Sequence, residues 1–363
     1  MDPAKAFERV TANTAEVVTE EELRALCEKA ARGETVRAYI GFEPSGHVHL
    51  GWKITADKVR DFVEAGFETT ILLADWHAQI NDKLGGSLEN IRVCGEYMKD
   101  CFAALGVAKE KVTFVYANDY VNDPDYWATV VAVAKNTTLA RMRRAMDIMG
   151  RSAEDAERDM SKFLYPAMQV ADIFHMDLDV AYGGLDQRHA HMLQRDVASK
   201  LGKKSAVAIH TPLLAGLKAQ GRMDPLEAKM SKRDPGSAIL IHDSAEEVAK
   251  KLNDAYCPQG QAEGNPVLQV AQYVLFPSLA REGHARFEID RPAKFGGPLT
   301  FGSYAELEQS YVAGKVHPLD LKKAVAAELN RVLDPARTYF SEHGASRKAF
   351  DEVRARLAQA APS

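Results

Sequence analysis

Residues 37–52 constrain the fold of this chain more than any other stretch. The run 37–42 is short and apolar, as in a buried β-strand, and a turn cluster with proline and glycine follows at 43–46. A helical pattern begins at about His49. This order is typical of the phosphate-binding corner of a doubly wound sheet, because a helix start presents unpaired N–H groups. The stretch favours a nucleotide site on a parallel α/β sheet, although a helix start with glycine and histidine is also common without one.

The remaining patterns divide the chain into two parts. Apolar runs predict further strands at 69–74, 112–116, 178–181 and 205–209, and amphipathic patterns predict helices at 52–65, 88–104 and 126–149. The first 36 residues have a helical and polar pattern, and strand patterns nearly vanish after the middle of the chain. Later helices are expected at 246–255, 266–275, 303–313, 318–332 and 337–360. We therefore predict a Rossmann-type doubly wound parallel sheet catalytic domain over residues 1–245 and a mostly α-helical domain over residues 246–363.

Composition narrows the class of protein. Of 363 residues, 46% are hydrophobic and 27% charged, and no apolar run approaches the roughly 18 residues of a membrane span. The N-terminus lacks a signal-peptide pattern, so a cytoplasmic location and no membrane are expected. The four cysteines show no C-x-x-C spacing, so no metal site is expected. A net charge of −5 argues against general nucleic-acid coating, but the arginines around Arg141 form either a local phosphate-binding patch or a solvated helix face.

One helix is predicted to carry an unusual polar face. Tyr165, Gln169 and Asp172 are spaced i, i+4 and i+7, so their side chains share one side among apolar neighbours. Unpaired polar groups against a core are costly, and such a face therefore usually meets a ligand or a partner. The next strand ends in 183–187, a second glycine-bearing turn that leads from a strand into a helix.

The loop 229–236 carries two lysines around a serine, which suits a clamp for phosphates or, alternatively, an exposed basic turn. His-Leu-Gly-Trp at 49–52 and Lys-Met-Ser-Lys-Arg at 229–233 together resemble the HIGH and KMSKS signatures of class I aminoacyl-tRNA synthetases. Three further stretches are similar to tyrosyl-tRNA synthetases of the archaeal/eukaryotic type: 39–46, 165–172 and 183–187. The resemblance extends from the N-terminal helix to about residue 335.

This resemblance implies a Rossmann-type catalytic domain, a helical anticodon-binding domain and a symmetric homodimer. It also implies a reaction in two steps. Tyrosine and ATP, the latter as its Mg²⁺ complex, form tyrosyl-adenylate and pyrophosphate, and the tyrosyl group then passes to the 3′ end of tRNA(Tyr). Neither a general base nor a tightly bound cofactor is expected, because the substrate carboxylate attacks the α-phosphate directly and catalysis rests on orientation and electrostatics.

The resemblance also implies roles for individual residues. Tyr39 and Asp172 are expected to bind the phenol hydroxyl of tyrosine. The substrate ammonium is expected to meet Asp75, Tyr165, Gln169 and Gln187. The expected ATP-site residues are Gly41, His49, Gly51, Asp186, Lys229, Ser231 and Lys232. Among these, His49, Lys229 and Lys232 are the expected catalytic residues, and the two lysines stabilise charge on the departing pyrophosphate.

Five residues are expected to contact tRNA. Arg141 and Arg188 match positions that approach the first base pair of the acceptor stem. In the C-terminal part, Phe295 is expected to stack on the first anticodon base and Asp320 to accept from its edge, with His317 in the same pocket. Ordinary core packing is the alternative for Phe295.

The sequence departs from the family pattern at Trp52, where HIGH has histidine, and at Arg233, where KMSKS has serine. Tryptophanyl-tRNA synthetase is the nearest rival family, but Tyr39 with Asp172 argues against it because an indole offers an N–H and no hydroxyl. A catalytically silent tRNA-binding paralogue and a small-molecule nucleotidylyltransferase would also carry some of these features. The intact lysines argue against the paralogue, and the nucleotidylyltransferase leaves the helical domain unexplained.

Overall fold

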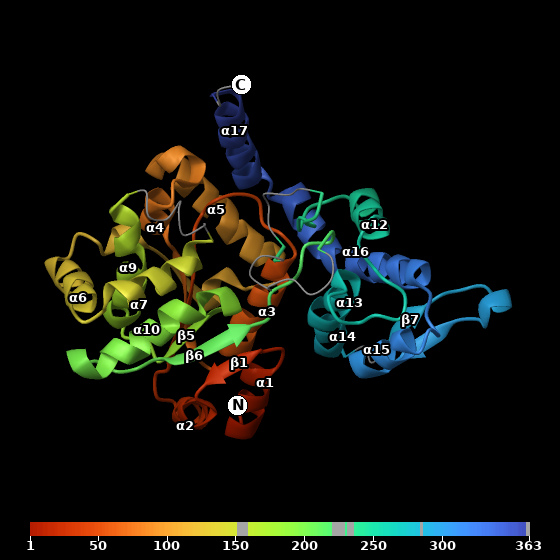
Figure 1. Cartoon of the computed structure of the whole chain (residues 1–363), viewed down its shortest axis with the longest axis horizontal. Helices are drawn as coiled ribbons and strands as arrows, with labels where there is room; N and C mark the ends of the chain where they lie inside the picture. Colours follow the sequence, from red (N-terminus) through yellow and green to blue (C-terminus); the bar gives the residue numbers. More distant parts are fainter. Residues whose placement is uncertain (151–158, 220–228, 231–235, 284–285, 361–363) are drawn as a thin grey trace. The chain divides into compact units, whose positions relative to one another are not determined.

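The computed structural model describes residues 1–150, 159–219, 229–230, 236–283 and 286–360 (Figure 1). The chain forms two compact units. The first comprises Met1–Gly46, Thr55–Pro212 and Gly344–Ser363, and the second comprises His47–Ile54 and Leu213–His343. No helix within the described ranges combines the length and the apolar character that crossing a membrane requires.

A six-stranded sheet with the order β1-β6-β5-β2-β3-β4 organises the first unit. Its parallel strands are β2 (Arg37–Phe42), β3 (Glu68–Leu73), β4 (Val112–Tyr116), β5 (Val180–Gly184) and β6 (Val207–Thr211). The predicted doubly wound parallel sheet is thereby confirmed. β1 (Glu16–Val18) pairs antiparallel with β6, with Glu16 opposite His210. The helical prediction for the first 36 residues is wrong at β1, because a three-residue strand has no periodic pattern and depends on a partner far along the chain.

The helices of the first unit are α1 (Pro3–Thr11), α2 (Glu20–Ala31), α4 (Asp75–Ile80), α5 (Leu88–Ala104), α6 (Pro124–Lys135), α7 (Leu139–Ala145), α9 (Ser161–His175), α10 (Arg188–Ala198) and α17 (Ala345–Ala360); α3 (Gly51–Glu64) begins in the second unit. Short 3-10 turns are η1 (Lys83–Gly86), η2 (Lys109–Lys111), η3 (Ala117–Asp119), η4 (Met146–Met149), η5 (Leu185–Gln187) and η6 (Ser199–Leu201). The single helix predicted over 126–149 is wrong. The Thr138 side chain accepts a hydrogen bond from the Arg141 N–H and so starts a new helix there.

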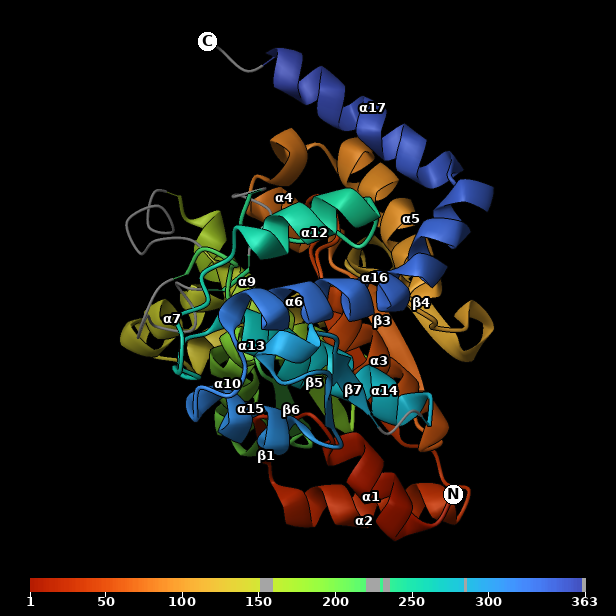
Figure 2. The same ribbon diagram turned by 90° about the vertical axis from the view of Figure 1, so that its right-hand side faces the viewer.

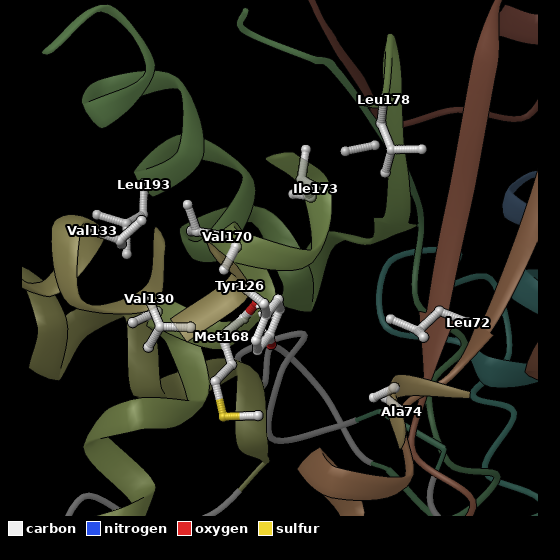
Figure 3. Close-up of a cluster of buried hydrophobic side chains, with 14 of the residues drawn as sticks. Leu72, Ala74, Tyr126, Val130, Val133, Met168, Val170, Ile173, Leu178 and Leu193 are labelled. Carbon is white, nitrogen blue, oxygen red and sulfur yellow. Dashed lines mark hydrogen bonds between the residues drawn. The ribbon is translucent and has the colours of Figure 1, made fainter. Parts of the chain in front are cut away.

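One apolar core cluster joins the sheet to α6, α9 and α10 (Figure 3). Leu72 and Ala74 enter it from β3 and its end, whereas Tyr126 comes from α6 and Met168 from α9. Burying one side chain such as Leu72 contributes roughly 1.5–3 kcal/mol. This packing fixes α9 against the sheet and thereby sets the direction of its polar face.

The second unit contains α12 (Ala245–Asn253), α13 (Pro266–Val270), the π-helical turn η7 (Ala271–Leu275), α14 (Phe276–Arg281), η8 (Ala293–Phe295), α15 (Tyr304–Val312) and α16 (Pro318–Glu342). β7 (Phe287–Ile289) and β8 (Leu299–Phe301) form a two-stranded antiparallel sheet. The predicted break between 332 and 337 is wrong, since α16 continues through Pro335. Buried side chains on both sides of the proline, Leu333 and Ala336 among them, hold the helix together despite its missing N–H.

The final helix packs within the first unit. Figures 1 and 2 show α17 beside α5, where Phe350 stacks on Tyr97 with ring centroids 5.1 Å apart. The compact units therefore do not coincide with the predicted division at 245/246. The assignment of catalytic and anticodon-binding roles to the two parts stays a prediction.

Candidate active site

Helix α9 and strand β2 assemble the predicted tyrosine-binding residues in the first unit. α9 presents Tyr165, Gln169 and Asp172, of which Asp172 is fully buried. Tyr39 of β2 is buried as well, and its hydroxyl is within hydrogen-bonding reach of Gln169. Burial and the negative charge of Asp172 raise the pKa of Tyr39, so its hydroxyl remains protonated. Four residues named from the sequence are therefore neighbours.

Asp172 has one satisfied and one unsatisfied oxygen. Its Oδ1 accepts hydrogen bonds from the hydroxyls of Tyr120 and Tyr126, at 2.8 and 2.9 Å. Its Oδ2 is buried and has no hydrogen-bond partner among the described residues. Burial raises the pKa of Asp172 to about 7, against the lowering effect of the two tyrosines. A buried acceptor without a donor costs about 1–3 kcal/mol, so Oδ2 suits a ligand that supplies an O–H or N–H.

His77 lies next to this oxygen. Its Nε2 is 3.4 Å from Asp172 Oδ2, and neither ring nitrogen is hydrogen-bonded within the described part of the chain. Burial lowers the pKa of His77 to about 4, so the ring is neutral and the contact is not an ion pair. A neutral imidazole donates from one nitrogen and accepts at the other. His77 and Asp172 together therefore match a hydroxyl, which also donates and accepts.

Glu43 fixes the hydroxyl end of Tyr165. The Tyr165 hydroxyl donates to Glu43 Oε1 at 2.8 Å, and Asn81 Nδ2 donates to the same oxygen at 2.7 Å. Asn81 also donates to the carbonyl of Met149 at 3.1 Å, and Lys83 Nζ lies 3.4 Å from Glu43 Oε2. Hydrogen bonds to a charged acceptor are strong and directional, so they hold the Tyr165 ring in one orientation.

Asp75 stands at the carboxyl edge of the sheet, where β3 ends and α4 begins. Its Oδ1 accepts from the backbone N–H groups of Trp76 and Asn118, at 3.0 and 3.1 Å. Its Oδ2 is 3.6 Å from Arg92 Nε and is buried without a hydrogen bond from the described residues. Burial raises the pKa of Asp75, and these neighbours oppose that rise. The carboxylate can therefore attract a further cationic group.

The turn after β5 brings Gln187 to the same polar face. Gln169 Nε2 donates to Gln187 Oε1 at 3.2 Å, and Gln187 Nε2 lies 3.5 Å from the carbonyl of Ile148. A Cβ at Gly183 would lie 2.8 Å from the Gln187 side chain, so this close approach requires glycine. Asp186 lies in the same turn, η5.

The segment with the HIGH-like signature belongs to the second unit. The Leu50 N–H donates to the Ile239 carbonyl at 2.7 Å, which ties this segment to a later part of the chain. The Gly51 N–H donates to His49 Nδ1 at 3.2 Å, and a Cβ at Gly51 would lie 2.9 Å from that ring. Gly51 therefore permits His49 to fold over the first turn of α3.

The other predicted ATP-site residues are Gly41 and the three residues of the signature loop. Lys229, in the second unit, forms an isolated antiparallel bridge with Ala215. Ser231 and Lys232 lie outside the described residues. Gly41, in the first unit, is exposed in β2, and a Cβ there would make ordinary contact with the Tyr39 ring at 3.5 Å. Packing alone therefore does not require glycine at this position.

The predicted tRNA contacts lie in both units. In the first, Arg141 donates to Asp196 through Nε and Nη2 at 3.1 and 3.0 Å, and Arg188 Nε lies 2.9 Å from Glu16 Oε2. In the second, Phe295 is 60% exposed, which rules out the alternative of core packing. His317 caps α16 by accepting from the Leu319 N–H at 3.2 Å, and Asp320 lies in the first turn of that helix.

Five residues of this site were not predicted: Glu43, His77, Asn81, Tyr120 and Tyr126. Glu43 lies in the turn cluster at 43–46, and His77 lies two residues after the predicted Asp75. Their positions just after the ends of β2 and β3 are the signal that could have found them. Tyr120 and Tyr126 carry no such signal, because they reach Asp172 across about 50 residues of chain.

Comparisons with known proteins agree with this geometry. A family model described as class I tRNA synthetases (W and Y) matches residues 31–334. A tyrosine--tRNA ligase from Aeropyrum pernix is 48% identical over 366 residues, 98% of this chain and 99% of the relative. Another from Sulfurisphaera tokodaii is 52% identical over 335 residues, 90% of each protein.

Solved structures show the same relationship. The crystal structure of tyrosyl-tRNA synthetase complexed with L-tyrosine from Pyrococcus horikoshii has a TM-score of 0.89 and 40% identity, and the match covers 97% of this chain and 100% of that one. Tryptophanyl-tRNA synthetase from Aeropyrum pernix K1 has a TM-score of 0.66 at 22% identity, covering 92% of this chain and 84% of that one, and shares the fold. The chain therefore belongs to the class I tRNA synthetases of the tryptophan and tyrosine family.

Proposed function

We propose that this chain is a tyrosine–tRNA ligase, which activates tyrosine with ATP and transfers the tyrosyl group to the 3′ end of tRNA(Tyr). The observation that carries the proposal is the buried Oδ2 of Asp172, which lacks a donor among the described residues and lies beside a neutral His77. A phenol hydroxyl supplies that donor, whereas phenylalanine has none. Relatives named tyrosine--tRNA ligase that match nearly the whole chain support the same substrate.

In the amino-acid site, Tyr39 and Asp172 bind the phenol hydroxyl. Tyr165, Gln169 and Gln187 hold the ammonium group, and Asp75 adds negative charge nearby. The links from Gln169 to Gln187 and from Tyr165 to Glu43 support these roles, because they fix the side chains before the substrate arrives. A site held in advance loses little entropy when tyrosine binds.

ATP enters as its Mg²⁺ complex. Gly41, His49, Gly51 and Asp186 line its site, together with the signature loop around Lys229. The tyrosine carboxylate attacks the α-phosphorus, and the bond to the bridging oxygen of pyrophosphate breaks. Three side chains of the loop act on the phosphates: Lys229, Ser231 and Lys232. The lysines stabilise the negative charge that develops on the departing pyrophosphate. The step needs no general base, because the attacking carboxylate is already ionised and has no proton to lose.

Transfer to tRNA uses a second set of contacts. Arg141 and Arg188 meet the acceptor stem, and Phe295, His317 and Asp320 meet the anticodon. The exposure of the Phe295 ring supports stacking on a base. The cytoplasm is the proposed location of this reaction.

Amino-acid-dependent exchange between ATP and pyrophosphate tests the function directly. We expect exchange with tyrosine and almost none with phenylalanine or tryptophan. Phenylalanine leaves Asp172 Oδ2 unpaired, and the indole of tryptophan places its N–H at a different position. Exchange with tryptophan would favour a tryptophanyl-tRNA synthetase, and no exchange with any amino acid would favour a silent tRNA-binding paralogue.

The enzyme acts as a homodimer in this proposal. Val131 of α6 and Leu139 of α7 expose 64% and 57% of their surface, which suits a contact with a second copy. We expect Val131→Asp to halve the mass measured by sedimentation equilibrium. Val312→Asp, at a comparably exposed position of the second unit, is the control. An unchanged dimer in Val131→Asp, or a monomer in both variants, would place the interface elsewhere.

A further inference from the structure

A continuous series of hydrogen bonds lies away from the polar face of α9. It joins four polar side chains: Arg188, Glu16, His210 and His191. Arg188 donates to Glu16 through Nε and Nη2, at distances of 2.9–3.0 Å. His210 Nδ1 lies 2.9 Å from Glu16 Oε2, and His210 Nε2 lies 3.0 Å from His191 Nδ1. The chain thus runs from the surface residue Arg188 through β1 and β6 and back to α10. Nothing in the activation chemistry uses Glu16 or either histidine.

The two histidines are a neutral, ordered pair. Both rings are almost fully buried and stack with centroids 5.1 Å apart. Burial lowers the pKa of both, although Glu16 partly opposes this for His210. Because Glu16 can only accept, His210 donates from Nδ1 and is left with Nε2 as an acceptor for the His191 Nδ1–H. Each ring is therefore held in one tautomer, and the hydrogen bonds all point toward Glu16.

Glu16 holds Arg188 by one edge. The guanidinium beside it lowers the pKa of Glu16, so the carboxylate stays charged. The pair occupies Nε and Nη2, whereas Nη1 makes no hydrogen bond within the described part of the chain. A guanidinium fixed in this way offers its outer edge for two parallel hydrogen bonds to a guanine or a phosphate.

This ion pair differs from an ordinary surface pair. Exposed pairs contribute little, because two long side chains must be ordered in water. Here the carboxylate is also held from behind by buried His210, so its position is set by the sheet. The position of His191, at the other end of this series of hydrogen bonds, is fixed as well. A Cβ at Gly183 would lie 3.4 Å from the His191 ring and 2.8 Å from Gln187, which shows how closely His191 underlies the substrate-site turn.

We propose that Glu16, His210 and His191 are positioning residues that fix Arg188 for recognition of the acceptor end of tRNA and connect it to the turn 183–187. This inference rests on the proposed function, in which Arg188 contacts the acceptor stem. The three residues touch no substrate. They act on the accuracy of tRNA charging and not on tyrosine activation.

The test compares charging of tRNA(Tyr) with charging of the same tRNA carrying an exchanged first base pair. Glu16→Gln keeps the size of the side chain but removes its charge, and its position is partly exposed, so the fold should tolerate it. We expect the ratio of kcat/KM between the two tRNAs to fall about tenfold, the effect of losing one charged hydrogen bond. Tyrosine-dependent pyrophosphate exchange is expected to stay at the wild-type rate.

Two variants of His210 test its hydrogen bond to Glu16. His210→Asn retains a donor toward Glu16 and is expected to keep most of the discrimination. His210→Leu removes the donor and is expected to lose it. Glu22→Gln is the matched control, because Glu22 pairs with Arg195, which lies on α10 like Arg188, and Gln can still cap α2.

The outcomes separate the two proposals. A wild-type protein that cannot charge tRNA(Tyr) would contradict the proposed function. Wild-type charging with an unchanged ratio in Glu16→Gln would overturn the positioning chain alone, as would an equal loss in Glu22→Gln. A fall in tyrosine exchange parallel to the fall in discrimination would also overturn it, since the effect would then be a general loss of structure.

Discussion

Asp172→Asn is expected to lower kcat/KM for tyrosine by about 100-fold, the scale of a hydrogen bond to a buried charge. The value for phenylalanine should change little, so the preference for tyrosine narrows. Tyrosyl-tRNA synthetases as a class reject phenylalanine by about 10⁵-fold, a figure known for that class and not obtained from this chain. Pyrophosphate exchange with each amino acid measures the ratio.

The pH dependence of Asp172→Asn tests whether the Asp172 carboxylate itself recognises the hydroxyl. Because burial raises the pKa of Asp172 to about 7, protonation below that pH removes an acceptor. We therefore expect kcat/KM for tyrosine to fall as the pH drops through 7 in the wild type, and this fall to be absent in Asp172→Asn. Asp179→Asn changes another buried carboxylate of the first unit, paired with Lys204, and serves as the control. If discrimination survives in Asp172→Asn, this residue does not recognise the hydroxyl.

Lys229→Ala is expected to lower kcat for tyrosine-dependent exchange by about 10²–10³-fold. The KM for tyrosine should remain close to its wild-type value. The reason is that the ammonium group acts on charge that develops only as pyrophosphate leaves. Steady-state exchange at varied tyrosine and ATP concentrations separates the two constants.

Lys218→Ala is the matched control, because Lys218 is an exposed lysine in the same unit, close in sequence to the signature loop. An equal fall in kcat in that variant would point to general loss of positive charge. A raised tyrosine KM with normal kcat in Lys229→Ala would instead place Lys229 in ground-state binding.

Local patterns predicted the elements that position the site. The helix expected at 88–104 has those bounds in the structure, because its ends are set by the Ser87 cap and by its own apolar face. The polar face of α9 could also be predicted, since helical spacing alone brings Tyr165, Gln169 and Asp172 together. These predictions succeed because helical spacing and helix capping depend only on residues close together in the sequence.

Long-range pairing escaped prediction. β1 is defined by its partner β6, almost 200 residues later, and the sequence around Glu16 carries no trace of it. The tyrosines that hold Asp172 come from the loop before α6 and from α6 itself, where they read as ordinary aromatic core residues. The prediction of a helix break near Pro335 is wrong for the opposite reason. Proline is a strong local signal for a break, but packing of buried side chains on both sides of it keeps α16 continuous.

β1 has a consequence for solubility as well as for recognition. Every residue of β6 is buried, and without β1 its outer edge would present unpaired N–H and carbonyl groups to other chains. Buried Lys58 secures the approach to β1 by donating to backbone carbonyls of the preceding segment, including that of Val10 at 2.8 Å. The N-terminal segment therefore covers an edge that would otherwise be prone to aggregation. By pairing with β6, the three-residue strand β1 prevents other chains from extending the sheet.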